Sequence, residues 1–234
     1  MNRITIITGL VACLSFAMTS GQSGEYFSKA PIDTGAKVVY EDPSTFYVFG
    51  FGGVNFVDGE TGLVNGSIPL LLELDDGYTF GGGAGVRTDF LGGSRFEIEG
   101  FYGENDVIGG AINGNAGPFS SASGVLETYG GHVNLVKEFD LGGIKPYVGG
   151  GIGYTEISAE NVAYGPINFS DRDGAFSWQI IAGLEVPITD NVGVYVEYNY
   201  HSVGEVAFQR SATTVLSFDD LTNHSVQGGV RIAF

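Results

Sequence analysis

From about residue 44 onwards, the chain divides into segments of about ten residues in which apolar and polar side chains alternate. A period of two places successive side chains on opposite faces of a β-strand. In segment 78–90, for example, Phe80 and Val86 share one face, whereas Thr79 and Arg87 share the other. This pattern predicts strands that have one apolar face and one polar face.

Eight segments follow this pattern or a glycine-rich form of it. They span residues 44–57, 78–90, 95–103, 125–139, 144–155, 177–186, 192–201 and 224–234. Six of them separate their apolar and polar sides clearly. Segments 44–57 and 144–155 are apolar on both faces, so the sequence leaves their inward side open.

The connectors between these segments alternate in length. Tight turns rich in Gly, Asp and Asn occupy 91–94, 140–143 and 189–191. Long polar stretches occupy 58–77, 104–124, 156–175 and 202–223. Short periplasmic turns and long outer loops are typical of bacterial outer-membrane barrels. An even number of strands then places both termini in the periplasm.

The composition favours a membrane location. Charged residues make up 16% of the 234 residues, well below the roughly 25% of soluble domains. After the N-terminus, no apolar run approaches the roughly 20 residues of a membrane-spanning helix, so a closed barrel is the remaining way to cross. We therefore predict an all-β fold: a closed antiparallel eight-stranded transmembrane β-barrel with short periplasmic turns and four long extracellular loops.

The N-terminus has the features of a secretory signal. Arg3 precedes an apolar run over 4–14, and small residues follow. We assign 1–21 to the signal peptide, with cleavage after Ala17 or near Gly21 both open. Residues 22–43 lack apolar periodicity and are assigned to a flexible periplasmic leader, which leaves 44–234 for the barrel.

The one cysteine, Cys13, lies within this predicted signal. Its removal would leave a mature chain without disulfides or thiolate chemistry. The run 10–13 resembles a lipoprotein-processing box, so lipidation of Cys13 stays open. The formal net charge is −17, and a surface this acidic repels phosphate polyanions, which argues against nucleic acid as a partner.

The polar faces of the predicted strands carry ionisable side chains of both signs. These are Arg87, Glu97, Glu99, His132, Glu185, Glu197 and Arg231. A soluble barrel would instead turn its apolar face inward around a ligand. We interpret the set as a charge cluster inside the barrel, which either holds it shut or switches partners as a gate. We favour a plug because an eight-stranded lumen is just wide enough for side chains to fill.

The histidines do not predict a catalytic site. His132 and His201 fall on inward faces, and His224 lies at the start of a strand. A barrel-wall lipid hydrolase needs a His and a Ser on one face, but the adjacent His201 and Ser202 point to opposite faces. We predict no catalytic, cofactor-binding or metal-binding residues.

The long loops are acidic and carry some apolar residues. Residues 171–174 (Asp-Arg-Asp-Gly) could hold Ca²⁺, but they do not complete a calcium-loop motif, so solvated loop charge is the preferred interpretation. Residues 68–72, Phe119 and Phe208 would provide apolar loop tips of the kind found on adhesion surfaces.

Three runs of sequence resemble a known family. These are Lys145-Pro-Tyr-Val-Gly-Gly-Gly-Ile-Gly-Tyr154, Tyr198-Asn-Tyr-His-Ser-Val-Gly204 and Gly228-Gly-Val-Arg-Ile-Ala-Phe234. They are similar to strands of small outer-membrane barrels of the OmpA and opacity-protein type. Asn199 departs from the Arg that is common there. The resemblance implies that Phe234 is the signal that the barrel-assembly machinery recognises.

From these observations we expect a non-enzymatic surface protein of the Gram-negative outer membrane, in contact with membrane lipid and lipopolysaccharide. Its role would be structural, with adhesion or other interactions through the loops and a possible extracellular ligand. No cofactor is expected. A narrow channel for small solutes is the first alternative, and a membrane-embedded lipid-modifying enzyme is the second.

Overall fold

The computed structural model describes residues 45–57, 59–89, 91–112, 123–164, 167–211 and 214–234. The predicted signal, the predicted leader and Phe119 lie outside these ranges. None of the described segments forms a helix that is long and apolar enough to span a membrane. The described strands are β1 (Thr45–Phe56), β2 (Glu60–Val64), β3 (Ile68–Leu74), β4 (Gly77–Thr88), β5 (Ser94–Ile112), β6 (Ser123–Glu138), β7 (Lys145–Tyr164), β8 (Ile167–Pro187), β9 (Val192–Val203), β10 (Val206–Ser211), β11 (Thr214–Phe218) and β12 (Leu221–Ala233).

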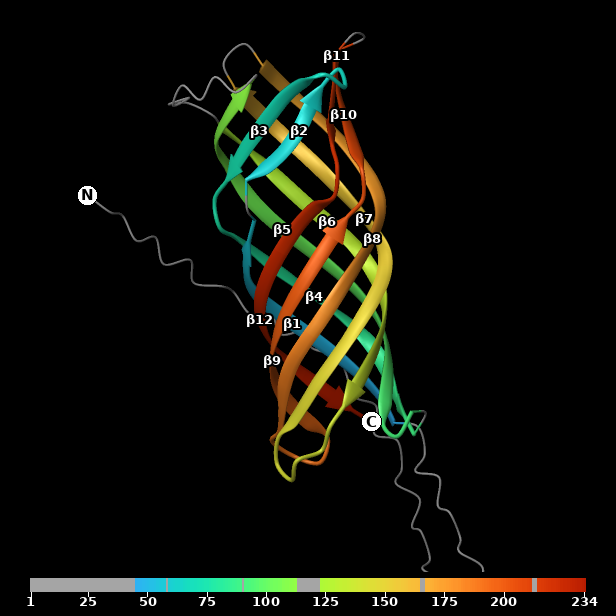
Figure 1. Ribbon diagram of the computed structural model, residues 1–234. Helices are drawn as coiled ribbons and strands as arrows, with labels where there is room; N and C mark the ends of the chain where they lie inside the picture. The colour runs from blue at the N-terminus through green and yellow to red at the C-terminus, as the bar shows by residue number, and fades with distance from the viewer. Residues whose placement is uncertain (1–44, 58, 90, 113–122, 165–166, 212–213) are drawn as a thin grey trace, which may run out of the picture. The chain divides into compact units, whose positions relative to one another are not determined.

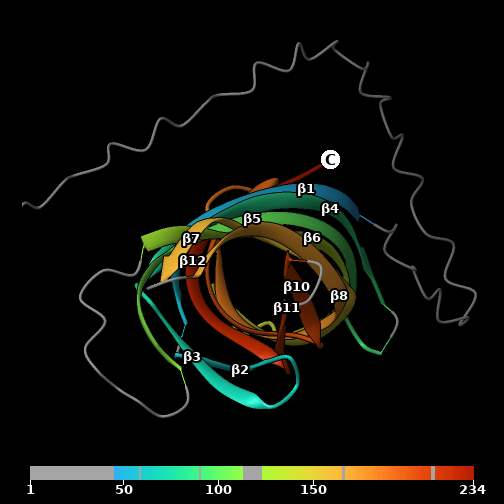
Figure 2. The same ribbon diagram turned by 90° about the horizontal axis from the view of Figure 1, so that it is seen from above.

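Eight of these strands close into an antiparallel ring (Figures 1 and 2). Going round the ring, the order is β1, β4, β5, β6, β7, β8, β9 and β12. The β1–β12 pairing and the β5–β6 pairing leave this ring without an open edge. The predicted closed eight-stranded barrel is thus confirmed, and its strands follow one another round the ring in chain order.

The alternation in the sequence decides which side chains face outward. Ile98 of β5 and Ile152 of β7 are 62% and 60% exposed, whereas Glu97, on the opposite face of β5, is 4% exposed. A soluble protein would not expose such a band of large apolar side chains. The band therefore faces lipid, and the polar set faces the lumen.

The two strands that were ambiguous in sequence point aromatic rings inward. Tyr47 and Phe49 of β1 are buried, and they lie over Gly85 and Gly83 of β4. A Cβ on Gly85 would lie 2.4 Å from the hydroxyl of Tyr47. Glycines on one strand thus make room for large rings from the next strand, which explains why β1 is apolar on both faces.

Aromatic side chains collect on the outside of the barrel, on the loop side of the apolar band. The rings of Trp178 and Tyr200 are 5.4 Å apart, and His224 packs against Tyr200 at 5.1 Å. On the other side of the barrel, Tyr78 and Tyr102 both donate to Glu104. The side chains of tyrosine and tryptophan combine an apolar ring with a polar group, and they are typical of the boundary between membrane and water.

The strands of the barrel differ in length. β5, β7 and β8 have 19, 20 and 21 residues, about twice what a transmembrane strand needs. β1, β4 and β9 have 12 residues each. Much of 104–124 and 156–175, which the sequence pattern indicated to be loop, is therefore a continuation of these long strands.

Two hairpins stand above the short strands and complete the wall at the loop end (Figure 1). The hairpin β2–β3 pairs with the end of β5, and β11 pairs with β2. Among the described residues, no backbone pairing joins β10 to β8. Instead, Asp173 accepts the backbone N–H of Ala207 at 2.7 Å, and Asp171 accepts that of Gln209 at 2.5 Å. We call this contact the carboxylate seam.

The inside of this loop-end wall is an apolar core. It contains Leu70, Leu72, Val107, Ile157, Ala159, Val162, Val203, Val206, Phe208, Leu216, Phe218 and Leu221. The expectation that residues 68–72 and Phe208 form exposed apolar tips is thus wrong for Leu70, Leu72 and Phe208, which alternation turns inward. Asp171 and Asp173 stay partly exposed, but their carboxylates also accept hydrogen bonds from β10.

Candidate functional site

The lumen at the turn end is filled by charged and tyrosine side chains, which we call the lumen clamp. Its members are Tyr47, Arg87, Arg95, Glu97, Glu138, Tyr147, Glu185, Tyr195 and Arg231. Each of the eight strands of the ring supplies at least one of them. Three arginines face three glutamates here, so the clamp is electrically balanced.

Ion pairs in the clamp cross the lumen from wall to wall. Arg87 on β4 and Glu185 on β8 lie on opposite strands of the ring, yet their Nη2 and Oε1 atoms are 2.8 Å apart. Arg231 reaches Glu97 at 3.3 Å and also pairs with Glu185. Contacts of this length leave no passage between the paired groups.

Arg95 is the member that the sequence-based set lacked. Its side chain is 0% exposed and pairs with Glu97 at 2.8 Å; Glu138 is a further partner. The guanidinium carbon lies 4.2 Å from the centre of the Tyr147 ring. Strand alternation places Arg95 on the same face as Glu97. This two-residue spacing is the sequence signal that could have identified Arg95 as a lumen residue.

Above the clamp, amide side chains surround two further carboxylates. Asn134 and Gln179 each donate to Glu99 at 3.0 Å. Gln227 donates to Glu197 at 2.7 Å. These contacts stabilise the carboxylates by hydrogen bonds but supply no positive charge.

Both inward histidines belong to a buried chain of hydrogen bonds. Thr155 donates to Ser177 at 2.8 Å, and His201 Nε2 lies 3.2 Å from the Thr155 hydroxyl. Ser177 lies 3.0 Å from His132 Nε2, and Glu99 is 3.7 Å from His132 Nδ1. The order of Ser177, His132 and Glu99 is that of a hydrolase triad, but Ser177 is 0% exposed. This buried set of hydrogen-bonded side chains is therefore inaccessible to a substrate.

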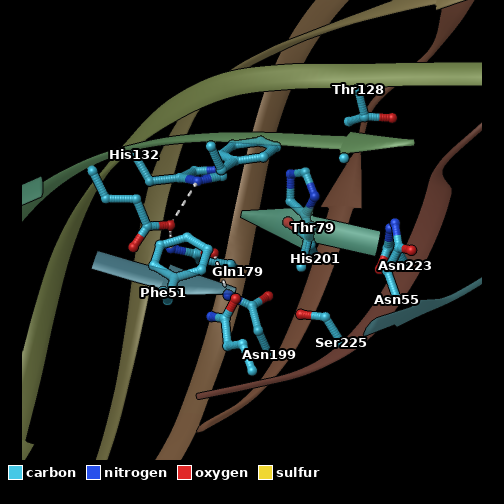
Figure 3. Close-up of a pocket in the computed structure, with 14 residues that line it drawn as sticks. Phe51, Asn55, Thr79, Thr128, His132, Gln179, Asn199, His201, Asn223 and Ser225 are labelled. Atoms are coloured by element: carbon cyan, nitrogen blue, oxygen red, sulfur yellow. Dashed lines mark hydrogen bonds and ion pairs between the residues drawn. The ribbon is translucent and has the colours of Figure 1, made fainter. Parts of the chain in front are cut away.

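Small cavities lie inside the described part of the barrel. One, of about 40 Å³, is lined by Asn55, Glu99, His132, Asn199 and Gln227 among others (Figure 3). The next, of about 30 Å³, lies under the apolar core and shares Thr128, His201 and Asn223 with the first. Since a water needs roughly 10 to 15 Å³, each holds a few waters at most.

All seven sequence-predicted interior residues face the lumen, but they form two groups. Arg87, Glu97, Glu185 and Arg231 belong to the clamp. Glu99, Glu197 and His132 lie in the polar layer above it.

Phe234 is exposed at the end of the chain, and its backbone N–H bonds to Phe46. In the described part of the chain, no three His, Asp or Glu side chains are placed to hold a metal ion.

A closed ring with an apolar outer band and a filled polar interior defines a transmembrane β-barrel of the bacterial outer-membrane class. The chain belongs to the outer membrane protein beta-barrel domain family, whose sequence model matches residues 9–234. Among curated protein sequences, none is significantly similar to the chain.

Solved outer-membrane barrels are among the structures to which the chain is similar. OprG from Pseudomonas aeruginosa has a TM-score of 0.52 at 14% identity, over 81% of this chain and 96% of that one. Neisserial surface protein A has a TM-score of 0.49 at 19% identity, over 82% and 100%. The outer membrane protease OmpT from Escherichia coli has 0.46 at 9% identity, over 85% and 99%. At these identities the likeness to OprG shows the fold alone.

Proposed function

We propose that this protein is a non-conducting, non-enzymatic surface barrel that presents a rigid platform above the outer membrane. The lumen carries this proposal, because wall-to-wall ion pairs fill one part and the apolar core fills the loop end. A barrel closed at both levels has no path for solutes. Its working surface is then the outside of the loop end.

The loop end has the features of an interaction platform. Its hairpins are anchored by strand pairing rather than free to move as single loops. Exposed acidic side chains surround it, namely Asp75, Asp76, Asp106, Glu160, Glu205 and Asp219. A rigid acidic surface favours ligands with basic groups, because fixed charges of one sign raise the rate of encounter with the opposite sign.

The placement in the cell envelope follows from the same features. In our proposal the loop end faces the exterior and both termini face the periplasm. The aromatic boundary with Tyr78, Tyr102 and Glu104 would contact the headgroups of lipopolysaccharide. The exposed Phe234 at the C-terminus would be available to the barrel-assembly machinery.

The experiment is conductance across planar bilayers, with insertion verified by the different electrophoretic mobility of boiled and unboiled samples. We expect no discrete conductance steps for the wild-type protein. A double variant, Glu97→Ala with Arg231→Ala, removes one cross-lumen pair and should raise the frequency of openings. Glu127→Ala on the outer face serves as the matched control and should stay silent.

Reproducible conductance steps from verified wild-type barrels would contradict the proposal and favour the narrow-channel alternative. Silence in both the wild type and the double variant would show that the clamp is not the only barrier, which the apolar core at the loop end explains.

A further inference from the structure

The polar layer above the lumen clamp has two glutamates without a basic partner. The three arginines of the clamp are matched by Glu97, Glu138 and Glu185. Glu99 and Glu197 have no ion pair with an arginine or lysine among the described residues. The Glu99 side chain is 6% exposed and Glu197 is 7% exposed. Buried charges without a counter-charge are costly, so two carboxylates here call for a positive partner.

The two inward histidines do not neutralise both carboxylates. Thr155 gives its one hydroxyl proton to Ser177, so it accepts a proton from His201 Nε2. Ser177 lies 3.0 Å from His132 Nε2, where either group can donate. His132 Nδ1 is 3.7 Å from Glu99, beyond hydrogen-bond distance, and Glu197 bonds to Tyr147 and Gln227 rather than to a histidine.

The 40 Å³ cavity is lined by Glu99 and by two residues that have unpartnered polar atoms. Asn55 is 1% exposed; its amide nitrogen donates to Asn105, while its oxygen has no partner. His132 Nδ1 also has no hydrogen-bond partner. Figure 3 shows His132 and Asn55 at opposite ends of the cavity, with Gln179 and Asn199 between them. Unmatched buried polar atoms of this kind are satisfied by water or by an ion.

We propose that this cavity is a binding site for a small, hard monovalent cation of the Na⁺ class, held with water between Glu99 and the oxygen of Asn55. Oxygen ligands suit hard cations. The cavity has room for about three waters, which matches a partly hydrated small ion. Since the described residues offer no cluster of three His, Asp or Glu ligands, the site lacks the charge for a tightly held divalent ion. The cation neutralises part of the charge that Glu99 and Glu197 create.

The site predicts that Na⁺ stabilises the folded barrel, because a ligand that binds only the native state raises its stability. The test is the thermal unfolding midpoint of the refolded protein in detergent, followed by the mobility of unboiled samples. NaCl is compared with N-methyl-D-glucamine chloride at equal ionic strength, since that organic cation is too large for the cavity. We expect the midpoint to rise by several degrees and to saturate with Na⁺.

Two variants connect the effect to the cavity. Glu99→Gln keeps the size of the side chain and removes its charge, so the response to Na⁺ should disappear. Glu127→Gln removes a carboxylate on the outer face of the neighbouring strand and should keep the wild-type response. If Glu99→Gln does not fold, Asn55→Leu removes the unpartnered oxygen without changing charge and should raise the Na⁺ concentration at half-effect.

Equal midpoints in the two salts for the wild-type protein would overturn the proposal. A full Na⁺ response in Glu99→Gln, or in Asn55→Leu where Glu99→Gln does not fold, would place the ion elsewhere and overturn it as well. A midpoint that depends on pH but not on Na⁺ would show that protons, rather than a metal ion, neutralise the layer.

Discussion

At the scale of single residues, the lumen is built from inward tyrosines that cover glycines and bond to glutamates. Tyr47 covers Gly85 and donates to Glu97 at 2.7 Å. Tyr147 covers Gly183 and donates to Glu197 at 3.0 Å. Such pairs bury a large ring and satisfy its hydroxyl at the same time, which fixes the position of the glutamates.

Removing Arg95 should destabilise the barrel strongly. Arg95→Ala removes an arginine partner from Glu97 and Glu138 in a buried site. Breaking a buried ion pair costs about 3 to 5 kcal/mol. The free energy of unfolding in urea can be followed by the fluorescence of Trp178, the one tryptophan. Arg172→Ala is the control, because its side chain is 72% exposed, and it should unfold like the wild type. Equal stability of Arg95→Ala and the wild type would contradict the clamp.

The space under a tyrosine ring can be tested with a single methyl group. A Cβ at Gly183 would lie 2.4 Å from the Tyr147 hydroxyl and 2.7 Å from the backbone oxygen of Val196. Overpacking of this kind costs about 1 to 3 kcal/mol. We expect Gly183→Ala to lower the free energy of unfolding by this amount. Gly228→Ala, whose nearest neighbouring atom is at 3.8 Å, should leave it unchanged, and a similar loss in both variants would contradict the packing.

At the scale of strands, the sequence predicts the part of the barrel that faces lipid, and does so for a physical reason. Contact with lipid on one side and the polar lumen on the other imposes a period of two. Above the membrane the outer face meets water, so strands such as the upper part of β5 carry Glu104 and Asp106 outward and lose that contrast. This is why 104–112 and 156–164 read as loop in the sequence but form strand.

The sequence predicts those features of the candidate site that depend on the alternation of side chains along each strand. Alternation placed the charged set inward, including Glu97 and Arg231. It could not show which charges pair, because Arg87 and Glu185 are brought together only by closure of the ring. It also could not separate the balanced clamp from the polar layer above it, since that depends on the height of each residue in the barrel.

The carboxylate seam should control the order of the loop end. Asp171→Ala with Asp173→Ala leaves two backbone N–H groups of β10 without acceptors, and hydrogen bonds to charged groups contribute about 1.5 to 3 kcal/mol. We expect faster proteolysis within 204–220 in intact proteoliposomes, with an unchanged unfolding midpoint of the transmembrane part. Asp106→Ala, an exposed position on β5, is the control. Wild-type cleavage rates in the double variant would show that the seam does not hold β10 in place.

At the scale of the whole molecule, the barrel has two halves with different interiors. The half in the membrane has an apolar outside and a polar, charged interior. The half at the loop end has an acidic outside and an apolar interior, as a soluble domain does. The inversion occurs where the environment changes from lipid to water, and it makes the hairpins β2–β3 and β10–β11 part of one folded wall.

The measurement that tests this account most directly is amide hydrogen exchange of the full-length protein in lipid nanodiscs, resolved by peptide. The central claim is that both halves are filled and folded. This claim predicts that backbone amides in 62–74 and in the strands 206–211 and 214–218 are protected for hours, approaching the protection of the transmembrane strands. Exchange of these segments within seconds, at the rate of an unstructured peptide, would show that the loop end consists of open loops and would contradict both the platform and the closed lumen.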